Sequence, residues 1–139
     1  MIILEKTSRM KARISEWVLS IGLLAWGIGI GSAPNIFNVE SYGPMSSVMT
    51  HLEWTTFVLL IAISRITVLV IDKLKVSLPH LRAIGAIGGL TLWGSLFSIS
   101  VMYASMRPTG VAIYGMLLVF DFLAMWWAAG DAKLADRTE

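Results

Sequence analysis

Two ionisable residues are the strongest candidates for chemistry, because each lies inside a long apolar stretch. Arg65 follows Trp54 by eleven residues, and Asp121 follows Val111 by ten. A helix rises about 1.5 Å per residue, so in two helices that cross a membrane in the same direction their depths agree to within about 2 Å. A charge at the centre of a bilayer costs at least about 2.5–3.5 kcal/mol, so such residues are usually paired or functional. The spacing predicts a buried Arg65–Asp121 ion pair, in which each charge offsets the desolvation of the other.

The sequence leaves three interpretations of this intramembrane charge pair open. The first is a structural bridge that fixes how the second and fourth spans pack. The second is a polar lining for a pore or an ion path. In the third, Arg65 extends its guanidinium group to the inner membrane surface and never meets Asp121.

The composition of the chain is far more apolar than that of a soluble domain. Of its 139 residues, 56% are hydrophobic and 14% are charged, and the mean hydropathy is +0.74. An average soluble domain has about 45–50% apolar and ~25% charged residues, and one this small has too much surface to hide the apolar excess. The composition therefore excludes a disordered tail, a collagen-like fibre and an ordinary soluble enzyme. The absence of cysteine excludes disulfide bonds and thiolate metal sites.

Four apolar stretches are long enough to cross a bilayer, whose core of about 30 Å needs about 20 helical residues. They cover approximately residues 14–33, 54–71, 83–104 and 111–129. Pro34-Asn35 ends the first stretch and Asp72-Lys73 ends the second. Arg107-Pro108-Thr109-Gly110 is predicted to form a tight turn between the third and the fourth. We therefore expect an all-α polytopic membrane protein, a four-helix bundle that forms a single membrane domain over residues 1–139.

The basic residues are distributed unequally between the two sides of these spans. Nine lie on one side, whereas Arg107 lies alone on the other. The positive-inside rule then places both termini in the cytoplasm, with residues 1–13 as a basic N-terminal segment, 34–53 as an outer loop and 130–139 as a cytoplasmic tail. The basic pI is thus a topology signal, and nucleic-acid binding is not expected. The nine residues are Lys6, Arg9, Lys11, Arg13, Lys73, Lys75, Arg82, Lys133 and Arg137.

Two glycine motifs have the spacing that allows close approach of membrane helices. Gly27-x-x-x-Gly31 lies in the first span and Gly85-x-x-x-Gly89 in the third. Both spans run in the same direction, but the first motif falls in the outer half of the membrane and the second in the inner half. The motifs therefore cannot face each other. Each needs another partner, either a different helix of this chain or a neighbouring copy.

No other group of residues has the spacing of a catalytic, cofactor or metal site. His51 is expected in the outer loop and His80 in the inner one, so the bilayer prevents them from sharing a metal ion. Glu16 is expected at the cytoplasmic edge beside Trp17. The sequence has no phosphate-binding loop, no nucleophile–base constellation and no zinc-ligand spacing. We expect no catalytic residue, no cofactor, no metal and no enzyme activity.

A series of short motifs runs through about two thirds of the chain, up to the C-terminal end. It consists of Glu53-Trp54, Arg65 in mid-span, Arg82 at the start of the next span, Thr109-Gly110-Val111-Ala112 with Tyr114, Asp121 and Gly130-Asp131-Ala132. This order resembles that of small four-helix inner-membrane proteins of tailed bacteriophages, some of which are labelled holin-like. The resemblance implies a host inner-membrane location and an oligomer that permeabilises or remodels that membrane. It implies no catalytic residue.

Three functions are consistent with these features. The first is a holin-like phage membrane protein that oligomerises in the host inner membrane and permeabilises or remodels it. The second is a non-catalytic structural or accessory subunit of a larger membrane complex, in which the same features only mediate packing. The third is a small four-helix transporter, a class that carries an embedded glutamate in its first helix, whereas Glu16 is expected at the membrane edge. The expected partners are the lipid bilayer and either further copies of this chain or other membrane subunits.

Overall fold

The computed structural model is all-helical over the residues that it describes. It describes the backbone of residues 2–39, 42–73, 79–103 and 108–135, and the side chains of residues 13–39, 42–72, 80–103 and 111–133. Most of the basic side chains used to orient the spans, such as Lys6, Lys75 and Arg107, lie outside the described residues. The elements are α1 (Ile2–Gly31), η1 (Ile36–Asn38), η2 (Gly43–Ser47), α2 (His51–Lys73), α3 (Pro79–Met102) and α4 (Pro108–Ala135), where η1 and η2 are short 3-10 helices.

Each of the four long helices contains a stretch that is long and apolar enough to cross a membrane. These stretches are Arg13–Gly31, His51–Asp72, His80–Met102 and Val111–Lys133. The prediction of an all-α chain with four membrane-length helices is therefore confirmed. Large apolar side chains are exposed on the outer surface of the helices, for example Val18, Leu60 and Val119. Such a surface is compatible with contact with lipid.

The start and end of α4 correct two predictions. Pro108, Thr109 and Gly110 were predicted to belong to a tight turn, but they are the first residues of this helix. Proline is favoured in the first turn of a helix. A backbone N–H group there would have no intrahelical partner, so proline loses no hydrogen bond by lacking one. Residues 130–135, predicted as part of the tail, continue the same helix. Hydropathy detects only the apolar part of a helix, whereas good helix formers such as Ala132 and Lys133 extend it further.

The start of α2 is set by a capping box. The N–H group of Thr50 donates a hydrogen bond to Oε2 of Glu53 (2.7 Å), and the N–H group of Glu53 donates to Oγ1 of Thr50 (3.4 Å). This reciprocal arrangement satisfies two backbone donors at the N-terminus of a helix. The helix consequently begins at His51, three residues before the predicted span.

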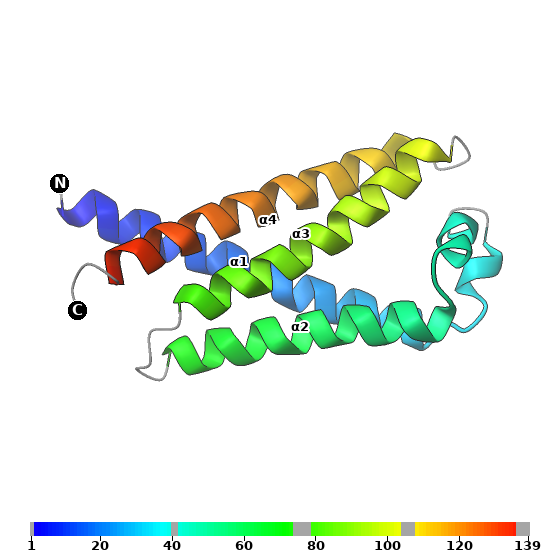
Figure 1. Ribbon diagram of the computed structural model, residues 1–139, viewed down its shortest axis with the longest axis horizontal. Helices are drawn as coiled ribbons and strands as arrows, with labels where there is room; N and C mark the ends of the chain where they lie inside the picture. Colours follow the sequence, from blue (N-terminus) through cyan, green and yellow to red (C-terminus); the bar gives the residue numbers. More distant parts are fainter. Residues whose placement is uncertain (1, 40–41, 74–78, 104–107, 136–139) are drawn as a thin grey trace.

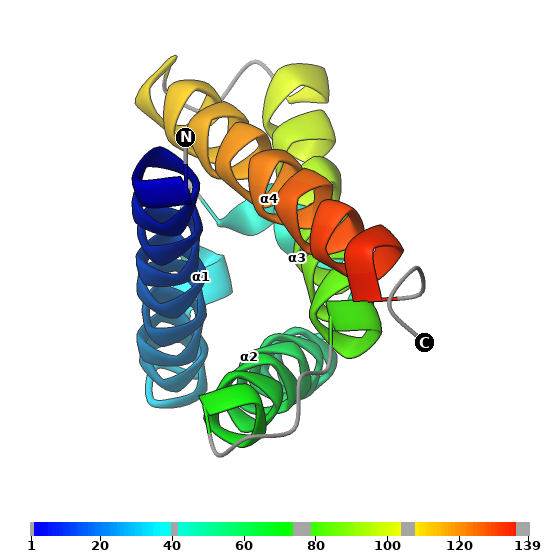
Figure 2. The same cartoon turned by 90° about the vertical axis from the view of Figure 1, so that its left-hand side faces the viewer.

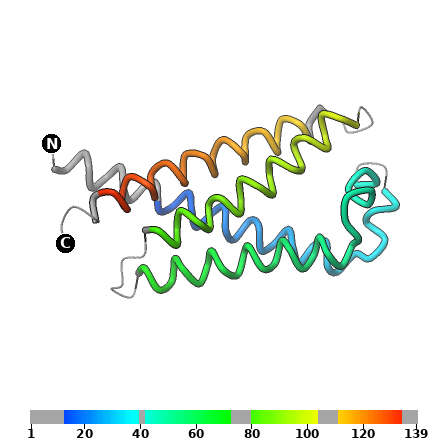
Figure 3. The backbone as a smooth tube through the Cα atoms, viewed as in Figure 1, coloured from blue at the N-terminus to red at the C-terminus, as the bar shows by residue number. Residues whose placement is uncertain are grey.

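The helices form two antiparallel hairpins, α1 with α2 and α3 with α4 (Figure 1, Figure 2). The start of α1, the end of α2, the start of α3 and the end of α4 lie at one end of the bundle, which we call the terminal end. The helices η1 and η2 lie at the opposite end, which we call the cap end (Figure 3). Each long helix therefore runs between the two ends.

The half of the bundle nearer the cap end has an apolar core that joins both hairpins. The indole N–H group of Trp54 donates to the carbonyl oxygen of Met45 in η2 (2.9 Å) and so fixes the cap to α2. The rings of Trp26 and Trp93 lie with their centroids 5.6 Å apart and connect α1 to α3. The buried members of this core are Leu23, Met45, Trp54, Val58, Ile61, Ala62, Leu92, Trp93, Leu96 and Ile99.

Candidate functional site

Buried charges lie from the middle of the bundle toward the terminal end. Arg65 of α2 contacts Asp121 of α4: Nη2 lies 2.7 Å from Oδ1, and Nη1 donates a hydrogen bond to Oδ2 at 3.0 Å. The two side chains are 5% and 0% exposed. This is the contact that the matched depths predict. Arg65 therefore does not extend its guanidinium group away from Asp121, as the third interpretation of the pair required.

The two contacts of this ion pair differ in geometry. Only the approach of Nη1 to Oδ2 has the direction of a hydrogen bond. Among the described residues, Oδ1 of Asp121 has no hydrogen-bond donor, so the short contact with Nη2 is an electrostatic one. A buried acceptor that lacks a donor is energetically unfavourable. The pair is therefore held mainly by its charge and by the shape of the site around it.

The glycines of α3 create the space for this ion pair. A Cβ atom on Gly89 would overlap Oδ2 of Asp121 and Nη1 of Arg65, and it would lie 2.9 Å from Cγ of Asp121. A Cβ atom on Gly85 would lie 3.1 Å from Cγ of Arg65. The Gly85-x-x-x-Gly89 motif thus accommodates side chains from two other helices of the same chain.

The second glycine motif also finds its partner within the chain. A Cβ atom on Gly27 would lie 2.8 Å from Cδ2 of Leu59, and one on Gly31 would lie 2.9 Å from Cγ2 of Thr55. Both contacts are with α2. The sequence left open whether each motif packs against another helix of this chain or against a neighbouring copy. In the structure, each motif packs against helices of its own chain.

A second cluster of buried charges lies nearer the terminal end. Arg82 of α3 donates from Nη2 to Oε1 of Glu16 (2.6 Å) and from Nε to Oε2 (3.0 Å). A bidentate pair of this kind combines charge with fixed geometry. Arg82 also donates from Nη1 to Oδ2 of Asp131 in α4 (3.2 Å). The side chains of Arg82 and Glu16 are 3% and 6% exposed.

This second cluster was not predicted from the sequence. Glu16 was expected at the cytoplasmic edge, and Arg82 was counted only as a basic residue between two spans. Both lie within the first turn of an apolar stretch that starts at the terminal end, and Asp131 lies in the last turn of one that ends there. The matched-depth argument that predicts the Arg65–Asp121 contact would have found them.

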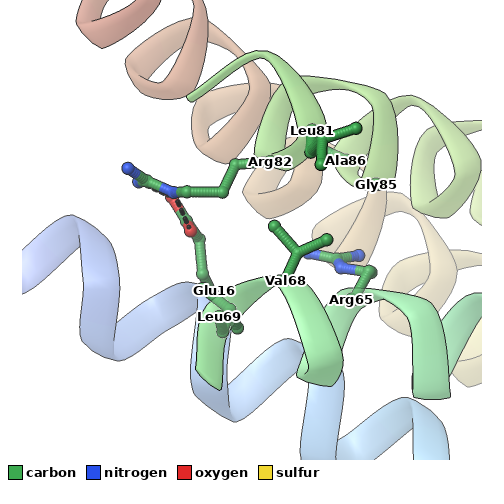
Figure 4. Close-up of a pocket in the computed structure, with 8 residues that line it drawn as sticks. All are labelled: Glu16, Arg65, Val68, Leu69, Leu81, Arg82, Gly85 and Ala86. Atoms are coloured by element: carbon green, nitrogen blue, oxygen red, sulfur yellow. Dashed lines mark hydrogen bonds and ion pairs between the residues drawn. The ribbon is translucent and has the colours of Figure 1, made fainter. Parts of the chain in front are cut away.

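A small recess, partly open at the surface, lies between the two charged clusters. Glu16, Arg65 and Arg82 line it together with apolar side chains. Figure 4 shows the side chain of Arg82 extending from α3 toward Glu16 on α1. The remaining lining residues are Val68, Leu69, Leu81, Gly85 and Ala86.

The described residues offer no cluster of three or more side chains that could hold a metal ion. The Nε2–H group of His51 donates to the carbonyl oxygen of Ile30 at the cap end (2.8 Å). His80 lies in the first turn of α3 at the terminal end, so the two histidines are separated by the length of the bundle.

The two clusters contain two arginines and three carboxylates, and together their ion pairs join all four helices. Their evident physical effect is to neutralise charge inside an apolar bundle and to join the helices there. A comparison with known proteins finds no matching protein-family model, no matching curated protein and no matching solved structure.

Proposed function

We propose that this chain is a multi-pass protein of a bacterial inner membrane that assembles into oligomers and permeabilises or remodels that membrane, as holin-like phage proteins do. The observation that carries the proposal is the uncovered apolar face of α4. Within the chain, 17% of the α4 span is buried, against 33–39% of the other three spans. A membrane helix with so little cover from its own chain has surface available for other helices.

The exposed residues of α4 have a spacing suited to contact between helices. Met116, Val119, Leu123 and Trp126 follow one another at intervals of three, four and three residues, and their exposed fractions range from 36% to 67%. Apolar residues at alternating intervals of three and four form the seam of a coiled coil. In lipid, such seams associate through van der Waals packing. We call these four residues the α4 seam.

The paired charges bear on where a permeable path would lie. Arg65, Asp121, Glu16 and Arg82 are engaged with one another inside the bundle. The proposal therefore places the path between copies of the chain and not through a single bundle.

The proposal includes an orientation with both termini in the cytoplasm. The nine basic residues predicted on one side of the spans and the single one predicted on the other support it. Reporter fusions after Glu139 should give a cytoplasmic signal, and fusions near Gly43 should give an external one. A cytoplasmic signal at Gly43 would contradict the orientation.

Inducible expression in bacteria tests the function. Expression of the unaltered chain should collapse the membrane potential, followed by loss of viability. The double variant Val119→Ala/Leu123→Ala should accumulate in the membrane, cross-link less into oligomers and depolarise less. The matched control is Ile21→Ala/Ile28→Ala, which alters two exposed apolar residues of α1. An unaltered chain that inserts without depolarising the membrane at any level of expression would overturn the proposal.

A second candidate, a non-catalytic accessory subunit, is favoured by a different observation. Both glycine motifs are occupied by helices of the same chain, so these close-packing sites are not open to further copies. In this case the α4 seam would contact other membrane subunits. Purification from native membranes separates the candidates: a homo-oligomer supports the first, and a fixed set of other proteins supports the second.

A further inference from the structure

The two hairpins are joined by two ion pairs of opposite polarity. The α1–α2 hairpin contributes Glu16 and Arg65, and the α3–α4 hairpin contributes Asp121 and Arg82. Each hairpin therefore supplies one arginine and one carboxylate, and each of these charges contacts an opposite charge of the other hairpin. Both ion pairs lie away from the cap end. Contact between the hairpins there therefore includes four buried charges beside apolar side chains such as Leu69 and Ala86.

Within each hairpin the helices are joined by close apolar contacts. Gly27 of α1 lies against Leu59 of α2, where a Cβ atom would come within 2.8 Å of Cδ2. Gly115 of α4 lies against Phe97 of α3, where a Cβ atom would come within 3.2 Å of Cε2. Close apolar packing of this kind resists separation of the two helices. Each hairpin therefore has the properties of a rigid unit.

The cap end joins the hairpins in a different way. The apolar core there draws buried side chains from α1, η2, α2 and α3. The hydroxyl groups of Ser47 in η2 and Tyr103 after α3 lie 3.3 Å apart and add a polar contact between the cap and the second hairpin. Water entering from the terminal end competes with ion pairs much more effectively than with a dry apolar core.

A second arrangement of the charges is available if the hairpins part. Arg82 already contacts Asp131, which belongs to its own hairpin. Arg65 and Glu16 line the same recess and belong to the other hairpin, so they are the opposite charges available to each other in that arrangement. Of the four charges that form ion pairs between the hairpins, three would thus keep a partner, while Asp121 would face the opened space. The unpartnered Asp121 favours the closed arrangement.

From these relationships we infer that the bundle has a second, open conformation, in which the hairpins separate at the terminal end and pivot on the apolar core at the cap end. The Glu16–Arg82 and Arg65–Asp121 pairs are the latch that holds the terminal end closed. A conformational change of this kind needs two discrete packings that differ by a few kcal/mol. The inference concerns a single chain and holds whether or not copies of the chain associate.

Distance measurements between spin labels test the inference, and the absence of cysteine makes the labelling specific. Val70→Cys and Ile84→Cys place labels on exposed positions of α2 and α3 toward the terminal end. Leu52→Cys and Met102→Cys do the same at the cap end. The latch is opened by Glu16→Gln/Asp121→Asn, which removes the carboxylate charges of both ion pairs with little change in volume. Glu16→Gln alone is the milder variant.

In lipid nanodiscs that contain one chain each, the latch variant should show a second, longer population of distances at the terminal end. The distances at the cap end should stay unchanged. Asp131→Asn is the matched control: it removes a contact within one hairpin and should lengthen neither distance. Unchanged terminal distances in both latch variants would overturn the inference. Lengthening at both ends would also overturn it, because the bundle would then have come apart instead of pivoting.

Discussion

Gly89 lies so close to Asp121 that a Cβ atom on the glycine would stand 2.9 Å from Cγ of the carboxylate. The same atom would overlap Oδ2 of Asp121 and Nη1 of Arg65. The backbone of α3 thus forms one wall of an ion pair to which α3 contributes no charge. The glycine is required at this position by the ion pair and not by an unusual backbone conformation.

Gly89→Ala should therefore destabilise the bundle. Alanine is favoured over glycine within a helix by about 1 kcal/mol, but displacing the buried pair would remove interactions whose loss typically costs about 3–5 kcal/mol. We expect a net decrease of about 2 kcal/mol or more in the free energy of unfolding in detergent. Gly88→Ala is the control in the same helix, because its Cβ atom would make an ordinary contact of 3.6 Å with Ile61. Equal effects of the two changes would show that the ion pair does not depend on Gly89.

The Arg65–Asp121 contact should appear in a double-mutant cycle. Arg65→Met and Asp121→Leu each leave one charge buried without its partner, which typically costs about 3–5 kcal/mol. The double variant leaves neither charge and should lose much less than the sum of the single changes. The same cycle on Arg13 and Asp72 provides the comparison: Arg13 is 51% exposed although Asp72 is 4% exposed, so water weakens this pair, and its coupling should be smaller than that of Arg65 and Asp121. Additive losses at Arg65 and Asp121 would mean that they do not interact in the membrane.

The sequence is sufficient for the number of membrane-length helices and for the Arg65–Asp121 contact. Both follow from general physics, since hydropathy detects spans and the helical rise converts sequence position into depth. The Glu16–Arg82 pair escaped prediction because the predicted third span began one residue after Arg82. An error of a few residues in the predicted boundary of a span moves a charge from the predicted interior of the membrane to its predicted edge.

The rotation of each helix about its axis is harder to predict from the sequence. In a soluble bundle, an apolar stripe marks the buried face, but lipid is as apolar as the core and removes that signal. Val18 is exposed and Leu23 is buried in the same helix, although both are apolar. The partners of the glycine motifs could not be assigned for this reason.

The Gly27 contact allows a test of helix packing in α1. Gly27→Leu should weaken the α1–α2 hairpin, because a Cβ atom alone would come within 2.8 Å of Leu59. Overpacking of this kind typically costs about 1–3 kcal/mol. Gly29→Leu is the matched control, since a Cβ atom there would meet nothing within 4 Å. We expect a lower thermal midpoint in detergent for Gly27→Leu and an unchanged one for Gly29→Leu. If both variants lose stability equally, glycine matters in this helix for some reason other than contact with α2.

The capping box provides a test outside the centre of the bundle. Thr50→Ala removes the hydroxyl group that accepts from the N–H group of Glu53 and donates to its carboxylate. Loss of such a cap typically costs about 0.5–2 kcal/mol. Thr67→Ala is the control, because the hydroxyl group of Thr67 is exposed and bonds only to the carbonyl oxygen of Ile63 in the preceding turn. Hydrogen exchange of the first turn of α2 should accelerate in Thr50→Ala and not in Thr67→Ala. Thr50→Ser keeps the hydroxyl group and should retain slow exchange; if it exchanges as fast as Thr50→Ala, the hydroxyl group is not what holds the start of α2.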